Sequence, residues 1–238
     1  RCCMIIKSVK TLGFIMTGLA TIAVIGGIAL VWLSGMSAGT PVSVDERALY
    51  SGTSEDNVAL MFNVYSGEEN LPSILQTLED HGAKATFFIG GVWAEKHADA
   101  LSDIVDAGQE TGSHGYLHRD HSAMDYEANL EEMRVAHKLI TGMTGQEITL
   151  FAPPSGAYNT ATLDAAETMG YRTVLWSKDT IDWRDHDSAL IAQRATDGLT
   201  GGDLILMHPT AETALALDEV LDAIENAGLN AATVSETL

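Results

Sequence analysis

The sequence predicts an α/β domain built around a parallel sheet. Seven apolar, β-branched runs alternate with stretches of helical periodicity, and this alternation is typical of parallel strands joined by helices. Polar, ionisable residues directly follow several of the runs, and side chains beyond the carboxyl ends of parallel strands meet at one edge of a sheet. The runs expected to form strands are 58–64, 85–89, 110–113, 148–151, 173–176, 204–207 and 229–234.

Helices are expected between the strands. The helical patterns cover 71–80, 92–107, 126–141, 159–169, 188–198 and 212–227. Glycines stand where a left-handed residue commonly ends a helix, at Gly82, Gly108, Gly142, Gly170 and Gly228. Seven strands with intervening helices fit a distorted or incomplete (β/α) barrel.

The N-terminal segment predicts a membrane anchor. Residues 11–34 carry no charged side chain and are long enough to cross a lipid bilayer as a helix, at about 1.5 Å per residue. Basic residues precede this run, so residues 1–10 are expected in the cytoplasm and the rest outside. We expect a linker over 35–56 and a domain over 57–238. A cleaved signal peptide is the alternative, although its apolar core normally spans only about 7–15 residues.

The net charge limits which partners the chain can bind, and the cysteine content limits which disulfides it can form. The formal net charge is −20, which disfavours binding to nucleic acid or to an anionic membrane surface but allows a neutral glycan. The two cysteines, Cys2 and Cys3, both lie in the predicted cytoplasmic segment. The external domain is therefore expected to fold without a disulfide.

Four short segments that follow predicted strands carry the ionisable residues. They are His114 to His118 (HGYLH), Phe151 to Gly156 (FAPPSG), Trp176 to Trp183 (WSKDTIDW) and Leu206 to Pro209 (LMHP). Histidines at positions i and i+4 present both imidazoles on one side of a helical turn, which suits a metal site. Alone, such a pair is more often a surface feature, but its position after a strand and among the other segments favours ligands.

These segments resemble four of the five signature motifs of the polysaccharide deacetylase family (NodB-like, carbohydrate esterase family 4), in the family's order. The chain is most similar to a membrane-anchored, sporulation-associated subgroup that also has FAPPSG as its third motif. The resemblance implies a NodB-like barrel and a bound Zn²⁺ or another divalent metal. It further implies removal of N-acetyl groups from a peptidoglycan-like or chitin-like wall glycan. Together with the predicted anchor, this indicates a single-pass protein of the cell membrane with its domain on the extracytoplasmic side.

The resemblance assigns roles to individual residues. His114 and His118 correspond to two metal ligands. His208 corresponds to the general acid that protonates the leaving amine, and Asp179 or Asp182 would steady it as the carboxylate of a triad does. The residues expected to bind substrate, unless they only pack at the rim, are Pro154, Gly156, Tyr158 and Trp183.

The first motif departs from the family pattern. The family has two successive aspartates, a general base and a metal ligand, where this chain has Asn63 and Val64. Asn63 can position a water but cannot deprotonate it, and Val64 cannot bind a metal. The arginine that holds the base in the family is replaced by Ala152. Losing both partners together is coherent, because a buried arginine without a carboxylate is costly.

Two repairs of the missing carboxylate are open. Glu69, or its neighbour Glu68, follows the same strand and would return a carboxylate to the site, unless the two only begin the next helix. Asp179 is the other candidate base. With a repair, the chain is a metal-dependent hydrolase of carbon–nitrogen bonds, a carbohydrate deacetylase. Without one, it is a catalytically silent homologue that binds glycan or serves as a scaffold at the cell envelope.

Overall fold

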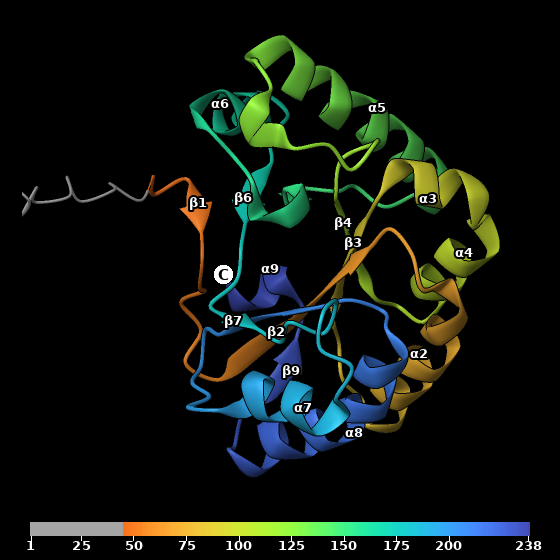
Figure 1. The fold of residues 1–238 in the computed structure, drawn as a ribbon, viewed down its shortest axis with the longest axis vertical. Coiled ribbons are helices and arrows are strands. Elements are labelled where there is room, and N and C mark those ends of the chain that lie inside the picture. Colours follow the sequence, from red (N-terminus) through yellow and green to blue (C-terminus); the bar gives the residue numbers. More distant parts are fainter. Residues whose placement is uncertain (1–44) are drawn as a thin grey trace, which may run out of the picture. The chain divides into compact units, whose positions relative to one another are not determined.

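A curled sheet of nine parallel strands forms the centre of residues 45–238, the part of the chain that the computed structural model describes (Figure 1). The strand order is β1-β6-β5-β4-β3-β2-β8-β7, and β9 pairs with β2 beside this path. The strands are β1 (Ala48–Leu49), β2 (Asn57–Val64), β3 (Thr86–Ile89), β4 (Glu110–Ser113), β5 (Leu150–Phe151), β6 (Arg172–Val174), β7 (Lys178–Asp179), β8 (Leu204–Met207) and β9 (Asn230–Ala232). Among these strands β1 and β7 end the path unpaired with each other, so the barrel is incomplete.

All seven predicted strands are confirmed, and the sequence patterns missed β1 and β7. Each of the two has only two residues, too few for any periodicity, and each pairs through its backbone with a longer strand. Strand β1 lies inside residues 35–56, where the sequence predicts a linker. Ala48 and Leu49 pair with β6, and the Gly52 backbone N–H donates to the Gly202 carbonyl oxygen over 2.7 Å. The last part of that segment therefore packs on the domain.

Helices surround the sheet on its outer side, whereas the short helix α9 (Val234–Thr237) lies within its curl, where Val234 joins the inner cluster of buried residues (Figure 1). The outer helices are α2 (Leu71–Asp80), α3 (Gly91–Lys96), α4 (Ala98–Asp106), α5 (Tyr126–Thr144), α6 (Thr160–Thr168), α7 (Ser188–Thr196) and α8 (Ala211–Asn226). Three short 3₁₀ turns lie between a strand and the helix that follows it: η1 (Glu68–Asn70) before α2, η2 (His121–Ala123) before α5 and η3 (Pro154–Gly156) before α6.

Two predicted helix boundaries are wrong. The helix expected over 92–107 is two helices, because His97 leaves helical geometry with φ −130° and ψ 49°. The helix expected to end at Gly142 continues to Thr144, and Gly145 takes the left-handed conformation that ends it, with φ 67°. A glycine inside a helix is tolerated, so Gly142 is a weaker stop signal than a left-handed cap.

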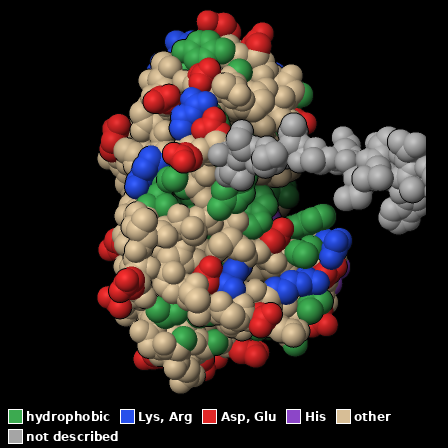
Figure 2. Space-filling view, turned by 90° about the vertical axis from the view of Figure 1, so that its left-hand side faces the viewer, with side chains coloured by type: hydrophobic (Ala, Val, Ile, Leu, Met, Phe, Trp, Pro, Cys, Tyr) green, Lys and Arg blue, Asp and Glu red, His purple; other side chains and the backbone are tan. Residues whose placement is uncertain are grey.

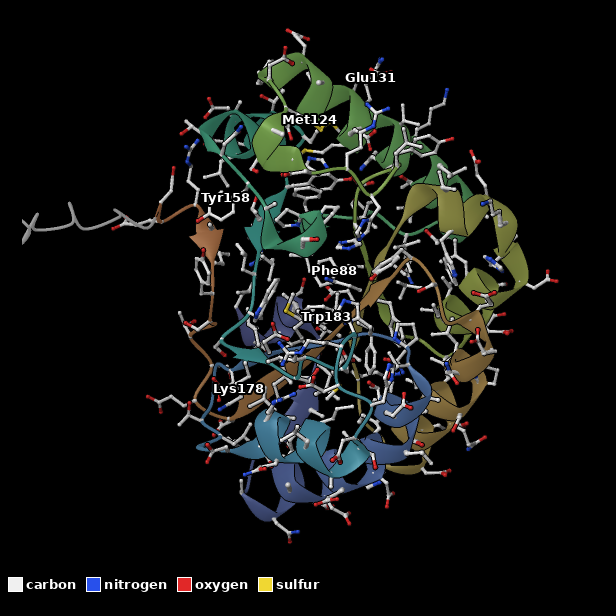
Figure 3. The ribbon with its side chains drawn as sticks, viewed as in Figure 1. Phe88, Met124, Glu131, Tyr158, Lys178 and Trp183 are labelled. Atoms are coloured by element: carbon white, nitrogen blue, oxygen red, sulfur yellow. The ribbon has the colours of Figure 1, made fainter. Side chains whose placement is uncertain are left out.

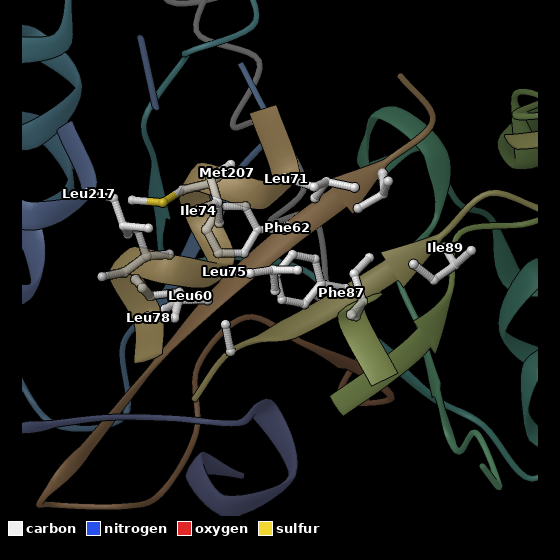
Figure 4. Packing of buried hydrophobic residues seen from close by; sticks show 14 of the residues in the cluster. Leu60, Phe62, Leu71, Ile74, Leu75, Leu78, Phe87, Ile89, Met207 and Leu217 are labelled. Carbon is white, nitrogen blue, oxygen red and sulfur yellow. The ribbon is translucent and has the colours of Figure 1, made fainter. Parts of the chain in front are cut away.

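Alternation along β2 divides the core into two clusters and aims one polar residue inward. Phe62 and Val64 belong to the outer cluster between sheet and helices, where Phe62 stacks on Phe87 with ring centroids 4.9 Å apart (Figure 4). Met61 belongs to the inner cluster enclosed by the curled sheet. Because successive side chains point to opposite faces of a strand, Asn63 follows Met61 toward the interior, at the carboxyl end of β2.

The surface is acidic, as the net charge of −20 requires. Asp and Glu side chains are spread over the face that Figure 2 presents, with Lys and Arg between them. No helix among residues 45–238 combines the length and the hydrophobicity needed to cross a bilayer. The predicted cytoplasmic segment 1–10 and the predicted anchor 11–34 lie outside the described residues.

Candidate functional site

A cavity of about 270 Å³ opens where the carboxyl ends of β2 and β8 meet the loops that follow β4 and β7. Six of the residues that the sequence singles out line it: Asn63, His114, His118, Asp179, Trp183 and His208. Four further residues complete the lining, Tyr65, Ser155, Trp176 and Leu206. The segments predicted to converge at the carboxyl edge of the sheet therefore do so.

The histidine pair is held in place by backbone bonds and burial. The Nδ1 atom of His114 lies 2.7 Å from the Ala152 carbonyl oxygen, so this nitrogen carries the proton and Nε2 keeps its lone pair. Burial, with the nearby His118, lowers the pKa of His114 to about 3, so this imidazole is neutral at pH 7. Burial also lowers the pKa of His118, whose ring centroid lies 5.1 Å from that of His114.

Asp182 and His208 form a hydrogen-bonded pair at the end of β8, in which both carboxylate oxygens of Asp182 accept bonds. Asp182 is completely buried, and its Oδ1 accepts from His208 Nδ1 over 2.8 Å. Its Oδ2 accepts from the His208 backbone N–H over 2.6 Å and from the Thr213 hydroxyl over 2.7 Å. Of the two aspartates proposed as partner, Asp182 is therefore the one that contacts His208. Asp179 instead accepts from the Ile181 N–H over 2.8 Å and is the one carboxylate lining the cavity.

Around the end of β2, three positions lack the charged side chains that the resemblance implies there. Asn63 is 3% exposed, and its Oδ1 has no hydrogen-bond donor among the described residues. Val64 is fully buried in the outer cluster, and Ala152 is buried in the inner cluster. At these three positions the structure supplies neither a base, nor a metal ligand, nor a cation.

Tyr65 extends the β2 wall into the space between the histidines. Its ring centroid lies 4.2 Å from that of His118, 6.1 Å from that of His114 and 6.0 Å from that of His208. Burial and the charge of Asp182 raise the pKa of the Tyr65 phenol, so it stays protonated at neutral pH. The Tyr65 ring is thus a neighbour of all three histidines that line the cavity.

The donor atoms of the site do not fit the implied metal centre. Catalytic zinc sites use three protein ligands and one open position. Within residues 45–238, the group of three His, Asp or Glu donors that lie within 4.8 Å of one another is His81 with Asp222 and Glu225, not the pair of His114 and His118. That group lies beside another cavity, and its two carboxylates are exposed. The histidine pair therefore lacks a third protein ligand.

The two glutamates suggested as repairs lie outside this cavity, whereas Asp179, the other suggested base, lines it. Glu69 is exposed in η1 and does not line the cavity, so the structure does not place it as the base. Glu68 turns toward α3, where its Oε2 accepts from the Trp93 indole N–H over 3.4 Å and its Oε1 lies 3.7 Å from His97 Nε2. Both glutamates belong to the 3₁₀ turn η1, which directly precedes α2, so they stand before that helix and not in its first turn.

Three of the four residues expected to bind substrate lie beside the lining. Pro154 is buried, and Gly156 lies under Trp176, where an added Cβ would approach the indole to 2.7 Å. Tyr158 bonds to the Tyr50 hydroxyl over 3.0 Å and packs near β1, away from Trp183 (Figure 3). Only Trp183, 55% exposed, lines the cavity itself.

Tyr65, Ser155 and Trp176 were missed, and two of them left a signal. Tyr65 shares the strand face of Asn63 by alternation, so the same reasoning that aims Asn63 inward reaches Tyr65. Trp176 begins the WSKDTIDW segment directly after a predicted strand. Ser155 depends on a left-handed backbone, φ 55°, which no sequence pattern announces for a serine.

Comparison with known proteins identifies related sequences. The sequence model of the family described as polysaccharide deacetylase matches residues 50–174. The chain is 33% identical over 197 residues to the uncharacterized protein YlxY of Bacillus subtilis (strain 168), covering 82% of this chain and 62% of that protein. It is 27% identical over 197 residues to the peptidoglycan-N-acetylglucosamine deacetylase PgdA of Listeria monocytogenes serotype 1/2a (strain 10403S), covering 82% of this chain and 42% of that protein. The chain thus spans less than two thirds of the length of either relative.

Solved structures share the fold. The crystal structure of a CE4 family pseudoenzyme from Bacillus anthracis superposes with a TM-score of 0.79 at 32% identity, covering 82% of this chain and 69% of that one. A mutant of that pseudoenzyme with restored enzymatic activity gives a TM-score of 0.79 at 30% identity, covering 82% and 72%. Since the family match spans more than half of the sequence, the chain belongs to the polysaccharide deacetylase family.

Proposed function

We propose that the cavity binds an N-acetylated glycan of the cell wall and does not hydrolyse it. One observation carries this proposal: Asn63, with an unpaired amide oxygen, and Val64, facing the outer cluster, stand where the resemblance expects a base and a metal ligand. Hydrolysis of an amide needs an activated water, and neither residue can activate one. The end of β2 therefore has no side chain that activates the attacking water.

The lining that remains suits a sugar. Tyr65, Trp176 and Trp183 offer aromatic surface against which the apolar face of a pyranose ring stacks. The Asn63 amide and the His208 ring supply a few directed polar groups, which is the usual composition of a ligand pocket. An acetamido group matches the unpaired Asn63 side chain, because each amide offers what the other accepts.

The relatives support both parts of the proposal. PgdA of Listeria is named as a peptidoglycan-N-acetylglucosamine deacetylase, which favours a wall glycan carrying N-acetyl groups as the ligand. The structural relative from Bacillus anthracis is described as a pseudoenzyme, which favours binding without turnover. We further propose that the domain acts at the cell envelope outside the membrane, with residues 11–34 as the anchor in the bilayer. A sporulation role is part of this proposal through the subgroup resemblance alone.

Two measurements on the same purified full chain test the proposal. Binding of chitotetraose and of soluble muropeptides is measured by titration calorimetry, and acetate is assayed after prolonged incubation with added zinc or cobalt. We expect saturable binding of at least one glycan and acetate no higher than in a protein-free blank. Acetate released in proportion to protein concentration would overturn the silent assignment, and a loss of all glycan binding would overturn the ligand.

A metal-dependent deacetylase is the second candidate, favoured by the Asp182–His208 pair, whose geometry suits a general acid. In this case Asp179 is the base, because it is the carboxylate that lines the cavity. Asp179→Asn would then abolish acetate release while leaving glycan affinity within about twofold. If the unaltered chain releases no acetate, the deacetylase candidate is already excluded and Asp179→Asn need not be tested.

A further inference from the structure

Metal-ligating side chains gather at a second place on the surface, where the end of α2 lies beside α8. His81 directly follows α2, and Asp218, Asp222 and Glu225 belong to α8. One ligand atom each from His81, Asp222 and Glu225 lies within 4.8 Å of the other two. We call these three residues the α2–α8 group.

The α2–α8 group lies toward the amino end of the sheet, away from the proposed glycan cavity. A cavity of about 150 Å³ beside it is lined by His81, Glu225 and Asn230, among others. Asn230 begins β9 and pairs with Asn57 at the amino end of β2, whereas Asn63 near the other end of that strand lines the glycan cavity. In β/α barrels the chemistry lies at the carboxyl ends of the strands, and the amino ends serve stability. A ligand bound here would therefore act on stability and leave glycan binding unchanged.

His81 is held in place, and the two carboxylates can move to meet it. The His81 side chain is 17% exposed, and its Nε2 lies 3.0 Å from Asp218 Oδ1, which holds the ring against α8. An imidazole oriented by a carboxylate is a common arrangement in zinc sites. Asp222 and Glu225 are exposed. Donors of a tetrahedral zinc lie about 3.4 Å apart, so these side chains need to close by no more than about 1.5 Å.

The negative charge around His81 has no cationic side chain to offset it. Asp218, Asp222 and Glu225 are spaced by four and three residues, so they share one face of α8, where like charges repel. Glu225 and Asp80 stand in the last turns of α8 and α2, where the helix dipole favours cations, and neither last turn has a basic residue. Within residues 45–238, Asp218 forms its ion pair with His81 alone. A bound dication would relieve this repulsion.

We propose that the α2–α8 group binds Zn²⁺ or a similar transition-metal dication, which ties the end of α2 to α8. One imidazole nitrogen with two carboxylate oxygens suits such an ion better than Ca²⁺ or Mg²⁺, which favour sites made of oxygen alone. Asp218 orients the His81 ring, and the adjoining cavity leaves room for water to complete the coordination. Two of the three ligands must be ordered from exposed positions, so the dissociation constant should be on the order of 10–100 μM.

Zinc binding and thermal unfolding of the full chain test this site. Calorimetric titration should give a dissociation constant on the order of 10–100 μM, and about 1 mM zinc should raise the Tm by roughly 3–10 °C. Asp222→Asn keeps the size of the side chain but removes a charged ligand. It should weaken zinc binding at least ~10-fold and remove most of the rise in Tm. His114→Ala should change neither result, because His114 lies in the other cavity.

The matched control is Glu219→Gln, which removes one negative charge from an exposed position of α8 outside the group. It should leave zinc affinity within about twofold of the unaltered chain. Binding weaker than about 1 mM, or affinity that Asp222→Asn leaves unchanged, overturns the site. An equal rise in Tm with about 1 mM magnesium would show screening of surface charge alone and would also overturn it. Glycan binding is measured separately, so none of these outcomes bears on the proposed function.

Discussion

The cavity has two facing walls, a β2 wall at the end of β2 with Asn63 and a β8 wall at the end of β8 with His208 and Asp182. They differ in how completely their polar atoms are hydrogen-bonded. On the β8 wall, buried Asp182 accepts three hydrogen bonds from His208 and Thr213. On the β2 wall, equally buried Asn63 leaves its Oδ1 without a donor. The bonded carboxylate ties the loop after β7 to the end of β8 and to the first turn of α8. These bonds give Asp182 and His208 a structural role beside any role in catalysis.

The largest expected effect comes from rebuilding the β2 wall. Asn63→Asp and Ala152→Arg return a base and a cation that keeps the new base ionised. Val64→Asp adds the metal ligand that the resemblance implies, and its carboxylate must turn from the outer cluster toward the cavity to bind the metal. With added zinc or cobalt, we expect acetate release from chitotetraose to rise at least ~100-fold above the unaltered chain, the usual contribution of a positioned base. The restored activity described for a mutant of the pseudoenzyme relative makes such a repair reasonable.

The control for the rebuilt wall adds His208→Ala, which should remove most of the gained activity, because the leaving amine then has no proton donor. A rebuilt variant that is folded by circular dichroism and binds metal, yet releases no acetate, would show that the β8 wall is not competent either. The comparison between the walls would then be wrong.

Removing the bonded carboxylate should cost the most stability. Asp182→Ala removes the acceptor of the His208 backbone N–H, of His208 Nδ1–H and of the Thr213 hydroxyl, so the free energy of unfolding should fall by about 3 kcal/mol. Urea denaturation measures this change. Asp179→Ala is the matched control, since Asp179 is only partly buried and accepts one bond, and it should cost less than about 1 kcal/mol. Equal losses in the two variants would contradict the structural role of Asp182.

The buried imidazole of His114 should make stability depend on pH. Burial, with His118 nearby, lowers its pKa from 6.5 to about 3 in the folded chain, so the unfolded chain binds more protons between these values. This contribution is complete above pH 6.5 and is lost as the pH falls toward 3, by up to about 1.4 kcal/mol per pH unit. Urea unfolding at several pH values should give a shallower slope for His114→Gln than for the unaltered chain. Parallel slopes would mean that His114 is protonated in the folded state.

The smallest expected effect comes from removing the unbonded amide. Asn63→Leu replaces a buried polar group that lacks a donor for its oxygen, and the cavity beside it leaves room for the side chain. We expect the free energy of unfolding to rise by about 1 kcal/mol, the opposite sign from Asp182→Ala. Thermal unfolding checks this, and a loss of stability would indicate that Asn63 is bonded after all. Glycan affinity should fall in the same variant, since the amide is proposed to read the acetamido group.

Long periodic elements and their convergence could be predicted from the sequence, and short or tertiary features could not. The runs behind β2 and α2 carry enough apolar residues for their period to be read, and α2 has the predicted bounds. Strands β1 and β7 have two residues each and exist only because a longer strand lies beside them. Backbone pairing of this kind leaves no trace in side-chain periodicity.

The candidate site divides in the same way. His114, His118 and His208 follow strands, so the topology alone brings them together. The glutamate repair at Glu69 looked close along the chain, but η1 turns that side chain outward, and sequence distance does not report a turn's direction. The choice between Asp179 and Asp182 depended on which carboxylate accepts the hydrogen bond of His208 Nδ1, which only tertiary geometry decides.

A zinc titration by calorimetry tests most directly whether the cavity lacks a metal ligand at the end of β2 and therefore binds no zinc. If His114 and His118 have no third protein ligand, the full chain should show no one-to-one site tighter than about 1 μM, and His114→Ala should leave the titration unchanged. Binding retained in His114→Ala but lost in Asp222→Asn belongs to the exposed group at His81. Tight one-to-one binding that His114→Ala abolishes would contradict the account and favour the metal-dependent deacetylase over the silent homologue.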